Sequence, residues 1–270
     1  MFFKGKGEDM FKKNDSMIDG HIHIEKGDYT IDWIKEFVRY AYKRGISEIN
    51  LLEHSYRFKE FERVYKKIAA YNEFQKSLLN ERMKLSLDQY KKLIKEVRKN
   101  KFPVKINFGL EVCFIEGTES IVKDIIESFD WDFMIGSVHW IDGWGFDHKK
   151  EFWEGKCVDQ LYKRYYEIMK SLIKSGLFDI LAHPDSIKCF GYYPSFDLEE
   201  TYMEIADLLN KYNMYAEQNG GLHLNYGCKE LGINSKMLNI FKKKNVKIIT
   251  ASDAHRPEDA GKYIRELSEL

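Results

Sequence analysis

The feature that most constrains the fold is a regular alternation of short apolar runs with longer segments of helical periodicity. Short runs rich in Val, Ile and Phe are typical of buried strands, whereas apolar residues three and four positions apart are typical of amphipathic helices. Seven such runs occur, at residues 17–22, 47–52, 104–111, 132–138, 178–182, 214–219 and 246–251. Seven strands separated by helices predict a parallel α/β fold of the TIM-barrel type.

The alternation extends over most of the chain, so we expect one domain over residues 1–270, with residues 1–16 as an N-terminal extension. The interval 57–101 departs from the pattern, because it is too long for one crossover helix. We expect two helices there, broken near residues 85–86 and inserted after the second strand. The sequence leaves open whether this insertion covers the mouth of the barrel as a lid.

The charge balance excludes several classes of protein. The chain has 43 Lys and Arg residues against 43 Asp and Glu residues, and a nucleic-acid or polybasic membrane binder normally has a one-sided excess of cations. No run approaches the roughly 18 apolar residues that a membrane helix needs, and the first residues lack the apolar core of a secretory signal. The four cysteines are widely spaced. We therefore expect a cytoplasmic protein with reduced thiols and a small-molecule partner; its oligomeric state stays open.

Histidines gather at the carboxyl ends of the predicted strands. Six of the eight histidines lie there, together with two carboxylates: His21, His23, His54, Glu111, His139, His183, Asp253 and His255. Because the carboxyl ends of the strands meet at one face of an α/β barrel, we expect these side chains to converge.

Convergent imidazoles and carboxylates indicate a metal centre. They are the usual ligands of zinc, iron and manganese, and the two histidines of an H-x-H segment share one face of a strand. The set exceeds the three protein ligands of a single catalytic zinc, so we expect two to three divalent ions, with a carboxylate bridging a pair. The absence of cysteine from the set favours a catalytic over a structural site, and the identity of the metal stays open.

Six motifs in order along the chain resemble the polymerase-and-histidinol-phosphatase (PHP) family, over residues 17–257. They are Asp-Gly-His21-Ile-His23, Glu53-His54, Gly-Leu-Glu111, Gly-Ser-Val-His139, Ala-His183-Pro-Asp and Ser-Asp253-Ala-His255. The resemblance implies a distorted seven-stranded barrel with a trinuclear metal centre that hydrolyses phosphate esters.

The resemblance also implies a distribution of ligands. A first ion would take His21, His23, Glu111 and Asp253; a second would take Glu111 as a bridge with His139 and His183; a third would take His54 and His255. Relatives carry one more ligand shortly after H-x-H, and Glu25 is the candidate here, with Asp28 as the substitute. Catalytic roles would fall to Glu111, Asp253 and His255. We expect Glu53 to orient His54 rather than to bind an ion.

The segments around His54, His139 and His183 further resemble the histidinol-phosphate phosphatase branch of the family. That branch implies hydrolysis of L-histidinol phosphate to L-histidinol and phosphate, in histidine biosynthesis, by a hydroxide that bridges two ions. Four residues are candidates for substrate binding. Two of them are arginines suited to bidentate phosphate binding, and the other two adjoin a glycine pair: Arg57, Arg256, Asn219 and His223.

Three alternatives stay open. A phosphatase of the same fold would act on another ester, such as a nucleotide or phosphotyrosine, and a panel of esters would separate the two. A metal-dependent amidohydrolase would have an eighth strand and often a bridging lysine after strand four, where this chain has His139. A non-catalytic metal-binding protein would hydrolyse none of the esters.

Overall fold

Seven parallel strands form one sheet in the computed structural model, which describes residues 17–270. In sheet order they are β1 (Met17–His23), β2 (Ile46–His54), β3 (Lys105–Cys113), β4 (Phe133–Ser137), β7 (Ile180–Leu181), β8 (Tyr215–Asn219) and β9 (Lys247–Ala251). Each of the seven strands expected from the sequence is present. The predicted extension at residues 1–16 lies outside the described residues.

The first and last strands of the sheet meet through a few contacts instead of a regular ladder. The backbone N–H of His23 donates to the carbonyl of Ala254 at 2.8 Å, and the N–H of Asp253 donates to the carbonyl of His21 at 3.0 Å. The hydroxyl of Thr250 also donates to the carbonyl of Ile18, at 2.7 Å. The sheet is therefore a nearly closed barrel, and the predicted distorted seven-stranded barrel is confirmed.

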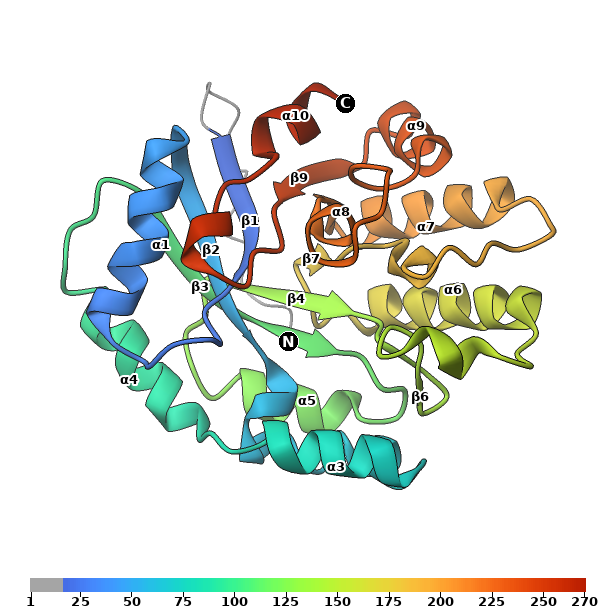
Figure 1. Ribbon diagram of the computed structural model, residues 1–270, viewed down its shortest axis with the longest axis horizontal. Coiled ribbons are helices and arrows are strands. Elements are labelled where there is room, and N and C mark those ends of the chain that lie inside the picture. Colours follow the sequence, from blue (N-terminus) through green and yellow to red (C-terminus); the bar gives the residue numbers. More distant parts are fainter. Residues whose placement is uncertain (1–16) are drawn as a thin grey trace.

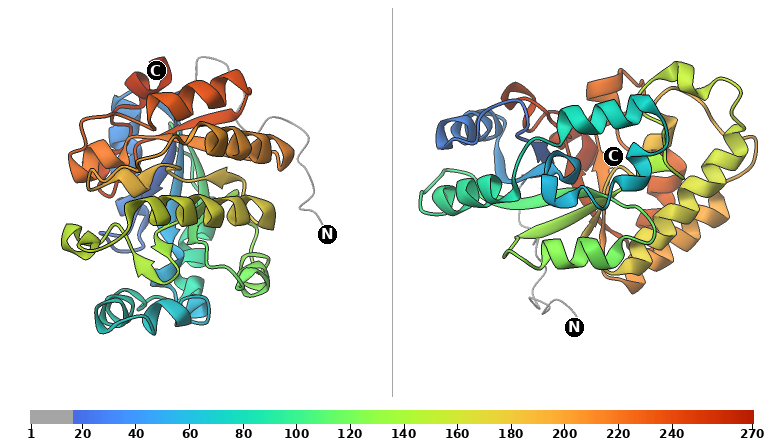
Figure 2. Two further views of the ribbon diagram at one scale, coloured as in Figure 1. Left: turned by 90° about the vertical axis from the view of Figure 1, so that its right-hand side faces the viewer. Right: turned by 90° about the horizontal axis from the view of Figure 1, so that it is seen from below.

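Helices surround the strands (Figures 1 and 2). They are α1 (Ile31–Lys43), α4 (Leu87–Val97), α5 (Glu119–Ile126), α6 (Val158–Ser175), α7 (Glu199–Lys211), α9 (Ser235–Lys243) and α10 (Ile264–Glu269), with the short α8 (Gly221–Tyr226) after β8. Within residues 17–270, no helix combines the length and apolar character needed to cross a membrane.

The core has two parts. Most buried apolar side chains form one large cluster, to which both the helices and the strands contribute. A smaller cluster is built almost entirely from strand residues: Leu52, Phe133, Ile135, Ile180, Ala182, Tyr215 and Ile249. Gly109 on β3 makes this packing possible, because a Cβ there would lie 2.5 Å from the ring of Phe133. Leu52 and His54 share one face of β2, so the packed strand residues lead directly to the ligand residues at the strand ends.

The interval 57–101 contains two main helices, as predicted, and some shorter structure. Turns of 3-10 helix and the single-turn α2 (Lys66–Ala69) lead into α3 (Glu73–Arg82), and α4 follows. The break falls at residues 83–86, where the Ser86 side chain caps α4 and Gln89 completes a capping box. A hairpin that the sequence analysis did not predict, β5 (Trp140–Ile141) and β6 (Trp144–Gly145), follows β4.

Candidate metal centre

The nine predicted ligands are brought together at the carboxyl ends of the strands. Seven of them line one cavity of about 830 Å³: Glu25, His54, Glu111, His139, His183, Asp253 and His255. The other two, His21 and His23, are fully buried against them. The arrangement follows from the parallel sheet, which places all carboxyl strand ends on the same side.

A first group forms around the H-x-H segment of β1. The Nε2 atoms of His21 and His23 lie 2.9 Å apart, because alternate residues of a strand share a face. Oδ1 of Asp253 lies 3.7 Å from each of these nitrogens. Oε2 of Glu111 lies 3.5 Å from His21 and 3.3 Å from His23. Four ligand atoms from three strands or strand ends thus surround one point.

A second group forms on the other side of Glu111. Its Oε1 atom lies 2.9 Å from Nε2 of His139 and 3.2 Å from Nε2 of His183. Since Oε2 faces the first group, the two oxygens of this one carboxylate point at two different sets of imidazoles. That is the arrangement expected of a bridging carboxylate.

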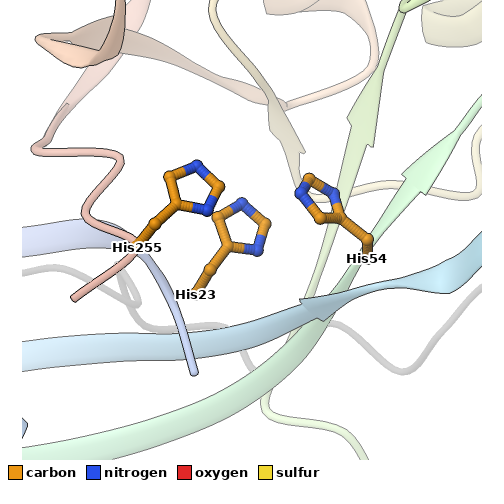
Figure 3. Close-up of side chains that lie close together, drawn as sticks. All are labelled: His23, His54 and His255. Atoms are coloured by element: carbon orange, nitrogen blue, oxygen red, sulfur yellow. The ribbon is translucent and has the colours of Figure 1, made fainter. Parts of the chain in front are cut away.

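A third group consists of His23, His54 and His255, which come from β1, β2 and the segment after β9 (Figure 3). One ring nitrogen from each lies within 4.8 Å of the others. The ring of His23 stacks on His54 with centroids 3.9 Å apart and on His255 at 4.4 Å. Glu25 joins this group, with Oε1 located 2.8 Å from Nδ1 of His255.

Unsatisfied polar atoms test whether these residues fit metal ions. Nδ1 of His23, His54 and His183 and Oε2 of Glu111 are buried and make no hydrogen bond among the described residues. His54 and Glu111 approach to 2.8 Å, but not in hydrogen-bonding geometry. Buried polar atoms without partners are rare, since each costs desolvation free energy, and the close approach of Nδ1 of His54 to Oε2 of Glu111 without a hydrogen bond matches two ligands of one cation. The donor set therefore fits divalent metal ions.

The pKa shifts keep parts of the cluster in the forms that bind metal. Burial lowers the pKa of His23 well below its usual value, and the neighbouring His54 and His255 lower it further, so the imidazole is neutral. Burial alone would raise the pKa of Glu111, but the electrostatic interaction with His54 and hydrogen bonds from His139 and His183 outweigh it and hold this pKa well below its usual range. Neutral imidazole and ionised carboxylate are the ligating states.

At two other histidines a raised pKa makes protons compete with metal ions for the ring nitrogen. For His255, burial disfavours the charged imidazole, yet hydrogen bonds to Asp253 and Glu25 outweigh that cost and raise its pKa to about 9. Burial likewise opposes the charge on His21, but Glu217 and Asp253 raise its pKa well above the usual value. These imidazoles carry protons at neutral pH unless a metal ion takes the lone pair.

Two carboxylates that are not among the predicted ligands orient imidazoles by accepting hydrogen bonds from the nitrogens on the far side of each ring. Oε1 of Glu217 lies 2.7 Å from Nδ1 of His21, and Oδ2 of Asp147 lies 2.6 Å from Nδ1 of His139. Such bonds fix the tautomer, so that Nε2 presents its lone pair to the cluster. Sequence reasoning did not identify the roles of Glu217 and Asp147. The available signal for Glu217 was a carboxylate inside the buried strand β8.

The backbone is strained at two of the ligand residues. His183 and Asp253 have positive φ values of 24° and 56°, a region that non-glycine residues seldom adopt. Gly221 supports the second position, because a Cβ there would lie 2.2 Å from Oδ2 of Asp253. Strain of this kind concentrates where a side chain must point in one particular direction.

The predicted substrate-binding residues divide into two sets. Arg57, Arg256 and Asn219 line the cavity. Asn219 already makes two internal bonds, donating to Glu217 at 2.7 Å and accepting from the N–H of Gly221 at 2.6 Å. The structure does not bring His223 to the cavity: it turns away to bond the carbonyl of Cys228 through Nδ1, at 2.7 Å.

Glu53 does not orient His54, contrary to the prediction. The Glu53 carboxylate accepts from the guanidinium of Arg57 at 3.1 Å and makes no contact with the His54 ring among the described residues. Neighbouring residues of a strand point to opposite faces, so a side chain at position 53 faces away from one at 54. Burial raises the pKa of Glu53 to about 8, although Arg57 opposes the shift.

Fold and site together define a barrel hydrolase with a cluster of metal ligands at the carboxyl ends of its strands. The sequence matches the PHP domain over residues 19–220, so the chain belongs to the PHP family, and the predicted family is confirmed. Membership also removes the amidohydrolase alternative, as does the count of seven strands in the described barrel.

Named relatives agree with this membership, and one solved structure shares the fold. The chain is 26% identical over 257 residues to a protein of Deinococcus radiodurans named "Probable histidinol-phosphatase", covering 91% of this chain and 88% of the relative. A protein of the same name from Schizosaccharomyces pombe is 20% identical over 179 residues, 58% of each chain. Histidinol phosphate phosphatase from Lactococcus lactis, solved with zinc, L-histidinol and phosphate, superposes with a TM-score of 0.66 at 19% identity, covering 93% of this chain and 94% of that one.

Proposed function

We propose that this protein is a metal-dependent phosphatase that hydrolyses L-histidinol phosphate to L-histidinol and inorganic phosphate, a step of histidine biosynthesis. The observation that carries the proposal is the cluster around Glu111, whose two oxygens face two separate sets of imidazoles. The choice of substrate is supported by the names of the relatives and by the ligands of the Lactococcus lactis enzyme. The cavity of about 830 Å³ is of the size that small-molecule substrates occupy.

We assign two to three divalent ions to the three groups of ligands. His21, His23 and Asp253 with one oxygen of Glu111 would hold the first, and His139 and His183 with its other oxygen would hold the second. His54 and His255 would hold the third, joined by His23 or by Glu25. Zinc, iron and manganese all suit this donor set. Ions at these positions would supply positive charge to the phosphoryl oxygens and would lower the pKa of bound water towards about 7.

The residues of the chain perform the remaining tasks. Glu111 would fix the spacing of the two main groups, while Asp253 and His255 line the cavity in which the substrate would bind. Arg57 follows β2 and Arg256 follows β9, and both line the cavity. We assign their guanidinium groups to the phosphate of the substrate. Binding of this kind fixes the ester over the cluster before reaction.

Apolar side chains limit the water in the cavity. Leu78 and Leu79 of α3 and Leu222 of α8 line it together with the ring of Tyr56, which stacks on His54 with centroids 4.6 Å apart. A drier cavity strengthens each charge interaction with the phosphate. We propose that this barrel acts as a single domain in which the insertion contributes one wall of the site.

A substrate panel tests the proposal. Phosphate release is measured from L-histidinol phosphate, nucleoside monophosphates and phosphotyrosine, using protein with its metal and protein stripped by a chelator. We expect L-histidinol phosphate to have the highest kcat/KM, and the stripped protein to be inactive until metal is restored. A higher kcat/KM for another ester would contradict the substrate, and release from none of them would contradict the phosphatase.

A further inference from the structure

Helix α3 contributes a cation to the cavity that no sequence motif indicates. Four of its residues line the cavity, and Arg82, in its last turn, is the one with a positive charge. The Arg82 side chain is 48% exposed, so its guanidinium is reachable from solvent and by a ligand. Arg57, by comparison, is only 17% exposed and bonds Glu53.

The helix is held in place at both ends. Near its start, the amide of Gln75 donates to the carbonyl of Gly143 and accepts from the N–H of Gly145 at 2.7 Å, which ties α3 to the β5–β6 hairpin. Beyond its end, the N–H of Leu85 donates to the carbonyl of Arg57 at 3.0 Å, and Leu85 in turn accepts from Lys59. The backbone at Arg82 is therefore fixed beside the cavity, and the side chain is free to adjust.

Two arginines converge on one carboxylate oxygen. Nη1 of Arg82 and Nη1 of Arg57 each lie 3.7 Å from Oε2 of Glu25. The other oxygen of Glu25 bonds His255, which belongs to the third group of ligands. Arg82 therefore lies next to a residue of the third ligand group, although it belongs to the insertion between β2 and β3 and not to a ligand motif.

The donors of Arg82 are not used within the described part of the chain. A separation of 3.7 Å is beyond hydrogen-bonding distance, and no hydrogen bond of this guanidinium to another described residue is found. A guanidinium has five N–H donors in a planar fork that matches two oxygens of a phosphate. The Arg82 guanidinium therefore lies at the site with its N–H donors available to a ligand.

The charge around the cavity favours an anion. Five Lys and Arg side chains line it, namely Lys26, Arg57, Arg82, Lys84 and Arg256, and outside the nine ligand residues the acidic lining residues are Glu81, Asp147 and Asp259. Asp259 is already paired with Lys262, at 2.5 Å. With the ligand carboxylates engaged by metal ions, cations outnumber the remaining carboxylates, and a local excess of one sign of charge attracts ligands of the opposite sign.

We propose that Arg82 is a substrate-binding residue, supplied by the insertion, which binds the phosphate group together with Arg57 and Arg256. The inference rests on the proposed function, since a phosphate ester is the ligand that the arginine would hold. It makes α3 part of the binding site, so that affinity for phosphate depends on the position of the insertion.

The test compares Arg82→Ala, Arg82→Lys and Arg63→Ala in the metal-loaded protein. Arg63 is an exposed arginine of the same insertion that does not line the cavity. Binding of inorganic phosphate is measured by calorimetry, KM and kcat are measured with L-histidinol phosphate, and metal content is measured for every variant. We expect Arg82→Ala to weaken phosphate binding and raise KM about 10-fold, at the lower end of the range for a charged hydrogen-bonding partner because the site is half-exposed.

Metal content and kcat should stay close to those of the unmodified protein, the lysine variant should recover part of the affinity, and Arg63→Ala should change nothing. Unchanged phosphate affinity in Arg82→Ala would overturn the inference, as would loss of metal, because the arginine would then act by holding Glu25. Phosphate binding requires no turnover. The effect of Arg82→Ala on phosphate affinity can therefore be judged independently of the proposed function. Failure of the proposed function would be seen as an unmodified protein that releases no phosphate.

Discussion

Replacement of Glu217 by glutamine tests how the cluster is held together. The carboxylate accepts three hydrogen bonds: from Nδ1 of His21 at 2.7 Å through Oε1, and from the N–H of His183 at 3.1 Å and the amide of Asn219 at 2.7 Å through Oε2. A glutamine amide has only one oxygen. If that oxygen accepts from the N–H of His183 and the amide of Asn219, the NH₂ group faces Nδ1 of His21. Nδ1 must then accept a hydrogen bond, so the proton of the neutral imidazole moves to Nε2, which can no longer bind metal.

The opposite orientation of the amide is no better. The NH₂ group would then face the N–H of His183 and the amide of Asn219, leaving those donors without an acceptor in a side chain that is fully buried. Loss of such a partner behind a metal-binding histidine typically costs about 10- to 100-fold in metal affinity. At about 1.36 kcal/mol for each factor of ten, this corresponds to about 1.4–2.7 kcal/mol.

Metal affinity is measured by competition with a chromophoric chelator, for Glu217→Gln and for Glu127→Gln as the control. Glu127 is an exposed residue at the end of α5, so its replacement should leave affinity unchanged. Equal metal affinity for Glu217→Gln and the unmodified protein would refute the reasoning that this hydrogen bond sets the tautomer of His21.

Three further predictions follow from the cluster. Glu111→Ala should lower metal content and turnover more than loss of any single histidine, since both of its oxygens face ligand groups; retention of both quantities would contradict the bridge. Asp253→Asn should lower metal content, whereas Arg256→Ala should keep it and reduce kcat/KM about 10- to 150-fold; metal analysis and kinetics of the two variants check this. Because the pKa of His255 is raised to about 9, protons compete with metal below that pH, so affinity at this position should fall about tenfold per pH unit towards acid, and a flat chelator titration would contradict it.

The sequence predicted the barrel and the cluster of ligand residues for one physical reason. Short apolar runs identify buried strands, and once strands are parallel their carboxyl ends must share a face, so residues at strand ends such as His54 and His139 come together from distant positions. Even β7, which is only Ile180–Leu181 in the structure, was evident from its apolar run.

Features that depend on the packing of one element against another were not predictable in this way. The partners of Glu217 and Asp147 depend on the distance between strands and on the path of the β5–β6 hairpin, neither of which appears in a local pattern. His223 follows a glycine pair, which suggested an approach to substrate, but the turn after α8 places the Cys228 carbonyl within reach and the imidazole bonds it. The path of the insertion beyond α3, and with it the place of Arg82, is likewise set by tertiary contacts.

We expect the convergent imidazoles and carboxylates to bind the metal ions on which hydrolysis of L-histidinol phosphate depends. The most direct measurement is to titrate chelator-stripped protein with zinc, iron or manganese while recording bound metal per chain and phosphate release from this ester. We predict that release rises with bound metal and reaches its plateau at two to three ions per chain. Full phosphate release by the stripped protein, or a metal-loaded protein that releases none, would contradict the account.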